Sequence, residues 1–386
     1  MTRPTALRVA LVSDWASPRR GGIELHLADL AARLRAAGHV ADVVTTTPGP
    51  DEEGVVRLRV PRLPGAGVAC TPALPHALRA TLGGGRYDVV HAHASVVSPA
   101  AYAGASVARR LDVPCVMTFH SLLHATARVL AAADAVSGWA RAPLVLTGVS
   151  NRVADQLRAA LPRARVAVLP NATDVVWWGA RPDGVPPRRD GELRVVTAMR
   201  LTRKKRTGDL ARIAAALDGA PNVRLVVAGD GPDRAALARA GHARLTLLGW
   251  QPREALRALY ADADLFVLPA AHESFGIAAL EARAAGLPIV GRARSGLADF
   301  VRDGVDGVLA PDADALVHAV RALVHDAPRR AALTHAARTA PPLAFDWARV
   351  LARHVALYEA LIDGREPDTG PWAAARSDSS SQRSTT

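Results

Sequence analysis

Cysteine is scarce in this chain of 386 residues, which contains only Cys70 and Cys115. Their spacing fits neither a zinc-binding motif nor a disulfide framework. The scarcity excludes a small disulfide-stapled fold and favours a reducing compartment. The apolar run near the N-terminus is too short for a signal peptide or a membrane span. We therefore expect a cytoplasmic protein. The sequence shows no internal repeat of solenoid period.

Aromatic residues make up only 4% of the chain, although the net charge is +12. Such a charge suits nucleic acid or an anionic membrane surface. The arginines are scattered, and few aromatic side chains stand among them for base stacking, which argues against nucleic acid. The amphipathic segment 75–82 would suit peripheral binding at the inner face of a membrane. A solvated surface explains the charge equally well.

Short apolar runs alternate with helical patterns through both halves of the chain. This alternation predicts an α/β protein with mostly parallel, doubly wound sheets, and the length allows two domains. The expected strands of the first half are 7–12, 40–45, 55–59, 87–91, 115–119, 144–147 and 166–169. Those of the second half are 193–198, 223–228, 244–247, 265–268 and 288–290. The expected domains are 1–175 and 192–344, with a linker at 176–191, a final helix at 345–363 that packs on the first domain, and a disordered tail at 364–386.

The stretch PAAHESFGIAALEARAAGLP, residues 269–288, places a loop and a helix after an apolar strand. A helix N-terminus favours an anion through its dipole and its free backbone N–H groups. Here those groups belong to Ser274, Phe275 and Gly276. The carboxylates of Glu273 and Glu281 bracket the site, which suits a ligand with phosphates between two sets of hydroxyls. Ordinary solvated helix charges are the alternative interpretation.

The sequence HESFGIAALEARAAGLPIV resembles the signature of glycosyltransferase family 4, the retaining enzymes of the GT-B fold. The resemblance implies two Rossmann-like domains facing a central cleft and a nucleotide sugar as the donor. It also implies that Glu273 meets the transferred sugar and Glu281 the ribose. It covers essentially residues 7 to 362.

Lysine is almost absent: of 48 basic residues only Lys204 and Lys205 are lysines, both within MRLTRKKRTGDL. Lysine carries a compact point charge, which differs physically from the planar fork of arginine. A solvated basic loop is one interpretation. The family has an arginine and a lysine five residues apart in this loop, and the resemblance therefore implies that Arg200 and Lys205 clamp the donor diphosphate. These cations make a metal unnecessary, and no cofactor is expected.

Glycines mark further candidate donor contacts. The pair Gly21-Gly22 opens a helix, but the spacing G-x-G-x-x-G of a dinucleotide site is absent, which argues against a dehydrogenase. The stretch GGIELHLADLAARLRAAGH resembles the family's glycine loop, which implies that Gly22 faces the donor phosphates. The turn VVAGDGPDRAAL resembles another family turn, which implies that Gly229 and Gly231 lie near the nucleotide. LGWQPREAL resembles the loop that borders the base, and this loop contains Trp250.

Three histidines are expected where strands end: His91 and His93 in YDVVHAH, and His120 in CVMTFHS. Half of a metal site is one interpretation, although no third ligand lies nearby, and hydrogen-bonded strand-end histidines are another. The family resemblance implies that His120 contacts the substrate or leaving group. It implies an acceptor-side position for His91, His93 and Asn171. Asp262-Ala-Asp264 resembles a metal-binding pattern of another glycosyltransferase fold, but it precedes a buried strand.

These observations predict the retaining transfer of a hexosyl unit from a UDP- or GDP-sugar to a hydroxyl acceptor. The acceptor is left open between a phosphatidylinositol-type lipid, a polyprenyl-linked lipid and a small molecule. An epimerase or hydrolase acting on a nucleotide sugar is the alternative on the same fold, and it would consume the donor without an acceptor. A basic nucleic-acid-binding protein is a more remote alternative, with salt-sensitive binding.

Overall fold

The computed structural model describes residues 6–19, 21–61, 68–95, 97–123, 126–141, 143–184, 191–220 and 222–372. These residues form two compact units. Unit 1 contains the chain up to Ala172 and returns with Trp347–Trp372. Unit 2 contains Thr173–Asp346.

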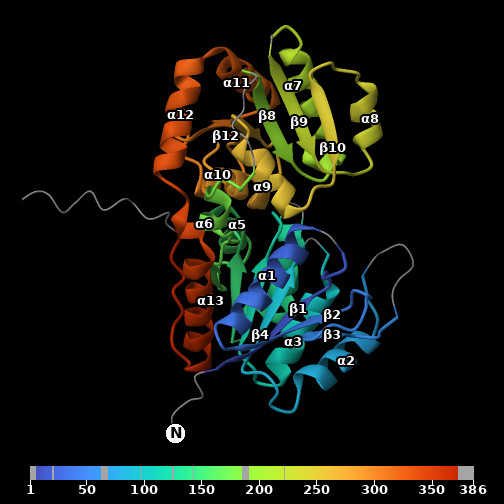
Figure 1. Ribbon diagram of the computed structural model, residues 1–386. Helices are drawn as coiled ribbons and strands as arrows, with labels where there is room; N and C mark the ends of the chain where they lie inside the picture. Colours follow the sequence, from blue (N-terminus) through green and yellow to red (C-terminus); the bar gives the residue numbers. More distant parts are fainter. Residues whose placement is uncertain are drawn as a thin grey trace, which may run out of the picture. The chain divides into compact units, whose positions relative to one another are not determined.

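Unit 1 is built on a parallel sheet whose seven strands, in its described part, have the order β3-β2-β1-β4-β5-β6-β7 (Figure 1). The strands are β1 (Arg8–Ser13), β2 (Val40–Thr45), β3 (Val55–Arg57), β4 (Val89–Ala94), β5 (Cys115–Phe119), β6 (Leu144–Gly148) and β7 (Arg165–Val168). The helices are α1 (Gly22–Ala36), α2 (Ala73–Leu82), α3 (Pro99–Arg110), α4 (Thr126–Ser137), η1 (Trp139–Arg141), α5 (Asn151–Ala160) and α13 (Trp347–Ile362).

Unit 2 contains a second parallel sheet, of six strands among its described residues, in the order β10-β9-β8-β11-β12-β13. The strands are β8 (Leu193–Ala198), β9 (Val223–Ala228), β10 (Leu245–Gly249), β11 (Leu265–Val267), β12 (Ile289–Arg292) and β13 (Gly307–Ala310). The helices are α6 (Val175–Gly179), η2 (Arg203–Lys205), α7 (Thr207–Leu217), α8 (Arg234–Arg239), α9 (Arg253–Ala261), α10 (Ile277–Ala284), η3 (Gly296–Asp299), α11 (Ala313–His325), α12 (Ala327–Thr339) and η4 (Leu343–Phe345).

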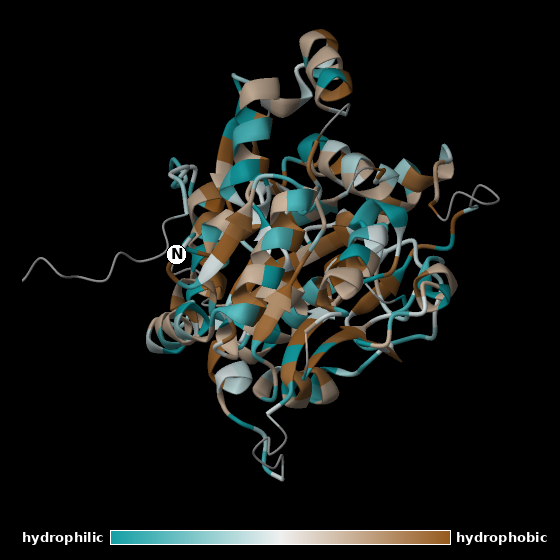
Figure 2. Cartoon of the chain, turned by 90° about the horizontal axis from the view of Figure 1, so that it is seen from above, coloured by the Kyte–Doolittle hydropathy of each residue, from teal (hydrophilic) through white to brown (hydrophobic). Residues whose placement is uncertain are grey.

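Each sheet has its own core. The central strands are near-continuous apolar runs, as expected of parallel strands with both faces covered, and they are largely brown in Figure 2. In unit 1, Leu27 and Leu30 of α1 pack with Val350 and Tyr358 of α13 against the sheet. The predicted doubly wound α/β fold is confirmed in both units.

The strand β4 differs from its prediction. It was expected at 87–91 but runs from Val89 to Ala94, so His91 and His93 lie inside the strand rather than at its end. Between β1 and β5 all six residues of β4 are buried, and buried polar rings are tolerated there because they find hydrogen-bond partners. The short edge strand β13 was not predicted.

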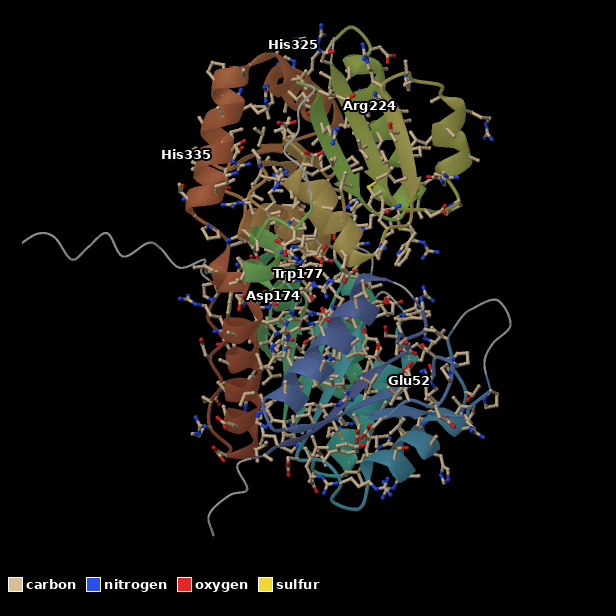
Figure 3. All side chains as sticks on the ribbon, in the orientation of Figure 1. Glu52, Asp174, Trp177, Arg224, His325 and His335 are labelled. Carbon is tan, nitrogen blue, oxygen red and sulfur yellow. The ribbon has the colours of Figure 1, made fainter. Side chains whose placement is uncertain are left out.

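Two segments expected to lack regular structure are partly ordered. The interval 176–191 begins inside α6, because Asp174 caps that helix by accepting a hydrogen bond from the backbone N–H of Trp177 at 2.9 Å (Figure 3). Residues 185–190 lie outside the described part of the chain. Residues 364–372, assigned to the disordered tail, lie against unit 1: Trp372 exchanges two hydrogen bonds of 2.9 Å with Asn151. Residues 373–386 are not described.

The amphipathic segment predicted at 75–82 belongs to α2, whose apolar residues Leu74, Leu78 and Leu82 are buried within unit 1. That face is therefore used for folding and is not open to a membrane. Among the described residues, none of the helices is both long enough and apolar enough to cross a bilayer.

Both sheets have a point where the strand order reverses. It lies between β1 and β4 in unit 1, and between β8 and β11 in unit 2. Ligands of doubly wound sheets bind outside the carboxyl ends of the strands at such points. A ligand site is therefore expected at the loops that follow these four strands.

Candidate active site

In unit 2 the loops after β8 and β11 are joined by an ion pair. Lys205 Nζ lies 2.6 Å from Oε2 of Glu273, although the two residues are 68 positions apart. The Lys205 side chain is 33% exposed and that of Glu273 only 10%. The backbone of Lys205 is held by the turn η2, where its N–H donates to Thr202. Two predicted site residues thus meet at the point where the strand order reverses.

The loop that carries Glu273 is fixed on three sides. The carbonyl oxygen of Glu273 accepts a hydrogen bond from Gly296 N at 3.0 Å. The ring of Phe275 is buried against Phe300 and against Phe345, with centroids 5.4 and 5.7 Å away. Gly276 begins α10 with φ of +96°, a conformation that suits glycine. The acidic side chain is therefore presented by a rigid loop.

Gly296 supports this loop, although it was not among the predicted site residues. A Cβ at this position would collide with the carbonyl of Ser274, so only glycine allows η3 to approach the Glu273 loop. Ser295 caps η3 by accepting from Leu297 N. The Ser-Gly pair was visible in the sequence, but its partner loop was not.

Glu281, the second predicted carboxylate, lies on α10 and is 8% exposed. It forms an ion pair with Arg253 of α9, at 3.9 Å. Burial, reinforced by the Glu281 carboxylate, raises the pKa of Tyr260 well above its usual value. The carboxylate of Glu281 therefore connects α10 to α9.

Arg200 is exposed and has no hydrogen-bond or ion-pair partner among the described residues. Gly229 and Gly231 serve the approach of two loops: a Cβ on Gly229 would collide with the carbonyl oxygen of Met199, and one on Gly231 with that of Leu201. The close packing of these loops therefore requires glycine at both positions, independently of any contact with the donor. Trp250 is 53% exposed in the loop between β10 and α9.

The Asp262-Ala-Asp264 pattern is used for folding. Both carboxylates bond to Arg194 of β8: Asp262 pairs with its guanidinium, and Asp264 accepts from its backbone N–H at 2.8 Å. The pattern therefore fixes the amino end of the β8–β11 pair. Groups of acidic, histidine or cysteine residues able to hold a metal ion are not found among the described residues.

In unit 1, His120 follows the end of β5, where its backbone N–H donates to Ala94 O at 2.8 Å. Its Nε2 lies 3.0 Å from Nδ1 of His93. The ring of His93 is 1% exposed, and its Nε2 has no hydrogen-bond partner among the described residues. His93 is therefore buried against His120, and its acceptor-side position stays a prediction.

His91 is fully buried, and both of its ring nitrogens are used. Nδ1 lies 2.6 Å from the hydroxyl of Tyr358, and Nε2 lies 2.6 Å from that of Thr118. Both ring nitrogens of His91 are therefore paired within unit 1, and its acceptor-side role stays a prediction. This chain of polar contacts holds α13 to β4 and β5.

Two further histidines, His26 and His354, were missed. The ring of His26 stacks on Trp347 with centroids 5.3 Å apart, and His354 lies 5.7 Å from His91. Burial lowers the pKa of all five buried histidines, to about 3 for His120 and about 4 for His354. The cluster is therefore neutral at physiological pH. His26 ends the motif GGIELH and lies on the buried face of α1, so its place in the helical pattern could have indicated that it is buried.

Gly22 starts α1, and a carboxylate, that of Glu24, lies in the first turn of this helix. Glu24 lies over Gly21 and pairs with Arg19 at 2.8 Å. The N-terminus of α3 bonds to Asp14, which accepts from Ala100 N at 3.0 Å. The anion site predicted at the glycine pair thus contains a side-chain carboxylate of the chain itself.

Asn171 lies in the turn after β7 and is 5% exposed. Its side-chain oxygen has no hydrogen-bond partner among the described residues. Asn171 is therefore a buried amide with an unpaired acceptor oxygen, and its acceptor-side position stays a prediction.

Comparison with known proteins identifies the family. The description "Glycosyltransferase Family 4" matches residues 20–177, and "Glycosyl transferases group 1" matches residues 183–340. The 2-deoxystreptamine N-acetyl-D-glucosaminyltransferase of Streptomyces fradiae is 33% identical over 307 residues, covering 72% of this chain and 70% of that protein. The chain belongs to glycosyltransferase family 4.

Two other relatives of this family 4 enzyme cover more of the chain. The D-inositol 3-phosphate glycosyltransferase 1 of Catenulispora acidiphila is 31% identical, covering 92% of this chain and 96% of that protein. One subunit of the phosphatidylinositol N-acetylglucosaminyltransferase of Arabidopsis thaliana is 29% identical, covering 83% of this chain and 75% of that protein. The family 4 enzyme therefore transfers a sugar from a nucleotide sugar to an acceptor.

Solved structures agree on the fold. Sucrose-phosphate synthase from Thermosynechococcus elongatus matches with a TM-score of 0.73 at 20% identity, covering 93% of this chain and all of that one. HepE of Anabaena, in complex with UDP and glucose, matches with a TM-score of 0.70 at 20% identity, covering 90% and 98%. The family 4 enzyme thus has the GT-B fold, made of two Rossmann-like sheets.

Proposed function

We propose that this enzyme transfers a hexosyl unit, with retention of anomeric configuration, from a UDP-sugar to a hydroxyl of a cyclitol ring. The observation that carries the proposal is the contact between Lys205 and Glu273 where the strand order of unit 2 reverses. A cation for the diphosphate and a carboxylate for sugar hydroxyls stand side by side there. Few ligands other than nucleotide sugars require a cation and a carboxylate at one point.

The donor site is assigned to unit 2. Lys205 and the exposed Arg200 stabilise the charge that develops on the departing diphosphate, which is usually the largest single contribution to such catalysis. Glu273 orients the sugar, and Glu281 accepts hydrogen bonds from the ribose. The half-exposed ring of Trp250 borders the base. UDP is favoured because HepE, a structural neighbour, was solved with UDP.

The chemical step needs no covalent nucleophile from the protein. The bond between the anomeric carbon and the phosphate oxygen breaks, and the acceptor oxygen bonds to the same face of that carbon. The acceptor proton passes to the departing phosphate. His120 of unit 1 is assigned a hydrogen bond to the substrate or leaving group. Because its ring is neutral, it can act as donor at one nitrogen and acceptor at the other.

The names of the relatives support this acceptor class, because they refer to 2-deoxystreptamine, inositol phosphate and phosphatidylinositol. All three acceptors contain a six-membered cyclitol ring. Two of the three names specify N-acetylglucosaminyl transfer, so UDP-N-acetylglucosamine is the first donor to test. A lipid-linked cyclitol would bring the enzyme to the inner face of a membrane, where its net charge of +12 favours anionic headgroups.

A nucleotide panel tests the donor site. Thermal unfolding is measured with UDP, GDP, ADP and UDP-N-acetylglucosamine, on the wild type, Lys205→Ala and Lys204→Ala. We expect UDP to raise the melting temperature of the wild type and of Lys204→Ala, but not of Lys205→Ala. Lys204 is the matched control, because it is the adjacent lysine and its exposed side chain makes no ion pair among the described residues.

Transfer is then measured with the three cyclitols as acceptors. We expect Lys205→Ala to lower kcat/KM by about a hundredfold or more, the loss typical of removing one donor to a developing charge. If no nucleotide stabilises the protein, the donor site is misassigned. If UDP-N-acetylglucosamine is consumed equally fast without any acceptor, the hydrolase or epimerase alternative replaces transfer.

A further inference from the structure

We infer that Glu273 also makes the donor site prefer a nucleotide sugar over the bare nucleoside diphosphate, by competing with the diphosphate for Lys205. The inference rests on the proposed function of this site and adds a specificity role to it. It concerns the release of the diphosphate product as well as the binding of the donor.

The geometry of the pair supports the competition. The distance of 2.6 Å between Lys205 Nζ and Glu273 Oε2 is that of a charge-assisted hydrogen bond. Glu273 is fixed by its loop and is only 10% exposed, so water cannot fully replace the lysine as its partner. Lys205, at 33% exposure, is the more accessible member. An incoming diphosphate therefore meets a lysine that is already bonded to the carboxylate, and it competes with that carboxylate for the ammonium group.

The two ligands differ in what they leave unpaired. A nucleotide sugar brings phosphates to Lys205 and sugar hydroxyls that donate to Glu273, so both members keep a partner. A bare diphosphate draws Lys205 away and supplies no donor to the carboxylate. Leaving a buried charged group without a partner is costly. The pair therefore favours the donor, and its re-formation after transfer favours release of the product.

A double-mutant cycle tests this inference. Binding of UDP and of UDP-N-acetylglucosamine is measured by NMR titration, which reaches millimolar affinities, for wild type, Glu273→Gln, Lys205→Met and the double variant. We expect Glu273→Gln to bind UDP about fivefold or more tightly than wild type, since leaving a buried charged group unpaired weakens binding by at least that factor. UDP-N-acetylglucosamine should gain nothing, so the preference for the sugar nucleotide falls by the same factor.

The double variant separates competition from simple repulsion. If Glu273 acts through Lys205, Glu273→Gln has no effect on UDP binding in the Lys205→Met background. A tightening that persists there means that the carboxylate repels the diphosphate directly, which overturns the inference. So does an unchanged UDP affinity in Glu273→Gln alone. Failure of UDP to bind the wild type overturns the proposed donor site itself, a different result.

Glu192→Gln is the matched control. Glu192 is also an ion-paired carboxylate of unit 2, with Arg224 at 2.7 Å and Arg194 at 3.2 Å. It precedes β8, whereas Lys205 follows the other end of that strand. The substitution removes the same charge, and we expect no change in UDP affinity. An equal tightening in both variants would attribute the effect to net charge and overturn the inference.

Discussion

The two points of strand-order reversal in this enzyme differ in how they treat an anion. In unit 2 the loop after β8 carries Arg200 and Lys205, and only one of these two cations is paired among the described residues. In unit 1 both helix N-termini at the same topological position have a carboxylate of the chain beside them: Asp14 bonds to the N-terminus of α3, and Glu24 lies in the first turn of α1. The same fold therefore provides a cationic site in one unit and a self-neutralised site in the other.

The carboxylate of Asp14 in unit 1 occupies backbone N–H groups that would otherwise bind a phosphate. Asp14 is fully buried and accepts from the backbone N–H groups of Ala100 and Ala101 at 3.0 and 3.4 Å. Glu24 lies over Gly21 at the start of α1. A helix N-terminus binds an anion through these N–H groups, and here an internal anion is present. We therefore expect phosphates to bind at unit 2 and hydroxyls at unit 1.

The largest expected effect is a loss of stability at acidic pH, and it is caused by the buried histidines of unit 1. Its five buried histidines have pKa values far below the ordinary 6.5, about 3 for His120 and about 4 for His354. Below pH 6.5 the unfolded chain binds protons that the folded chain does not. The free energy of unfolding therefore falls as the pH drops from 6.5 towards 4, and at pH 5 His120 and His354 each account for about 2 kcal/mol of this loss.

Urea unfolding at pH 7.5 and pH 5.0 measures this loss. His354→Leu should reduce it by about 2 kcal/mol, because that ring no longer titrates. His335→Leu is the control: His335 is an exposed histidine on α12 of unit 2 (Figure 3), and its removal should leave the loss unchanged. Equal losses in wild type and His354→Leu would contradict the assignment to the cluster.

The strands were largely accessible from the sequence, for a physical reason. β2, β5, β8 and β9 have the predicted bounds, because each is a mostly apolar run rich in valine or other strand-forming residues. β4 was misplaced because its histidines resemble a strand end, whereas hydrogen bonds satisfy them inside the sheet. Such compensation depends on partners from distant elements, which local patterns do not reveal.

The contacts within the site were not accessible. Lys205 and Glu273 were both named from motifs, but their ion pair spans 68 positions and exists only because β8 and β11 are neighbours. His26 and His354 join the histidine cluster from opposite ends of the chain. Their burial follows from the packing of α13 on α1, and a periodicity that is local to either helix carries no sign of the other.

A smaller effect tests whether the glycines of unit 2 support the cationic loop or contact the donor directly. Gly231→Ala would place a Cβ against the carbonyl of Leu201, and we expect a loss of about 2 kcal/mol in stability. Gly219→Ala is the control, since its Cβ would meet nothing within 4 Å. Thermal unfolding and UDP affinity are measured together. Weaker UDP binding with an unchanged melting temperature would assign Gly231 to the donor instead.

The smallest expected effect concerns the charge of the acceptor and bears most directly on unit 1. Glu24→Gln removes the internal anion from the α1 N-terminus while keeping the side chain nearly the same size. A charge at a helix terminus contributes about 0.3–1 kcal/mol, so stability should change by no more than this. The same energy corresponds to a change of about two- to fivefold in acceptor preference.

Competition between 2-deoxystreptamine and inositol 3-phosphate as acceptors measures that change. The first carries positive charge and the second negative charge, so Glu24→Gln should shift kcat/KM away from the amine and towards the phosphate. Glu53→Gln, an exposed carboxylate elsewhere in unit 1, is the control for net charge. An unchanged ratio would mean that Glu24 serves only α1 and Arg19, and that the acceptor is held by other groups. A shift confined to Glu24→Gln would place the acceptor beside the α1 N-terminus, where the unit supplies its own anion.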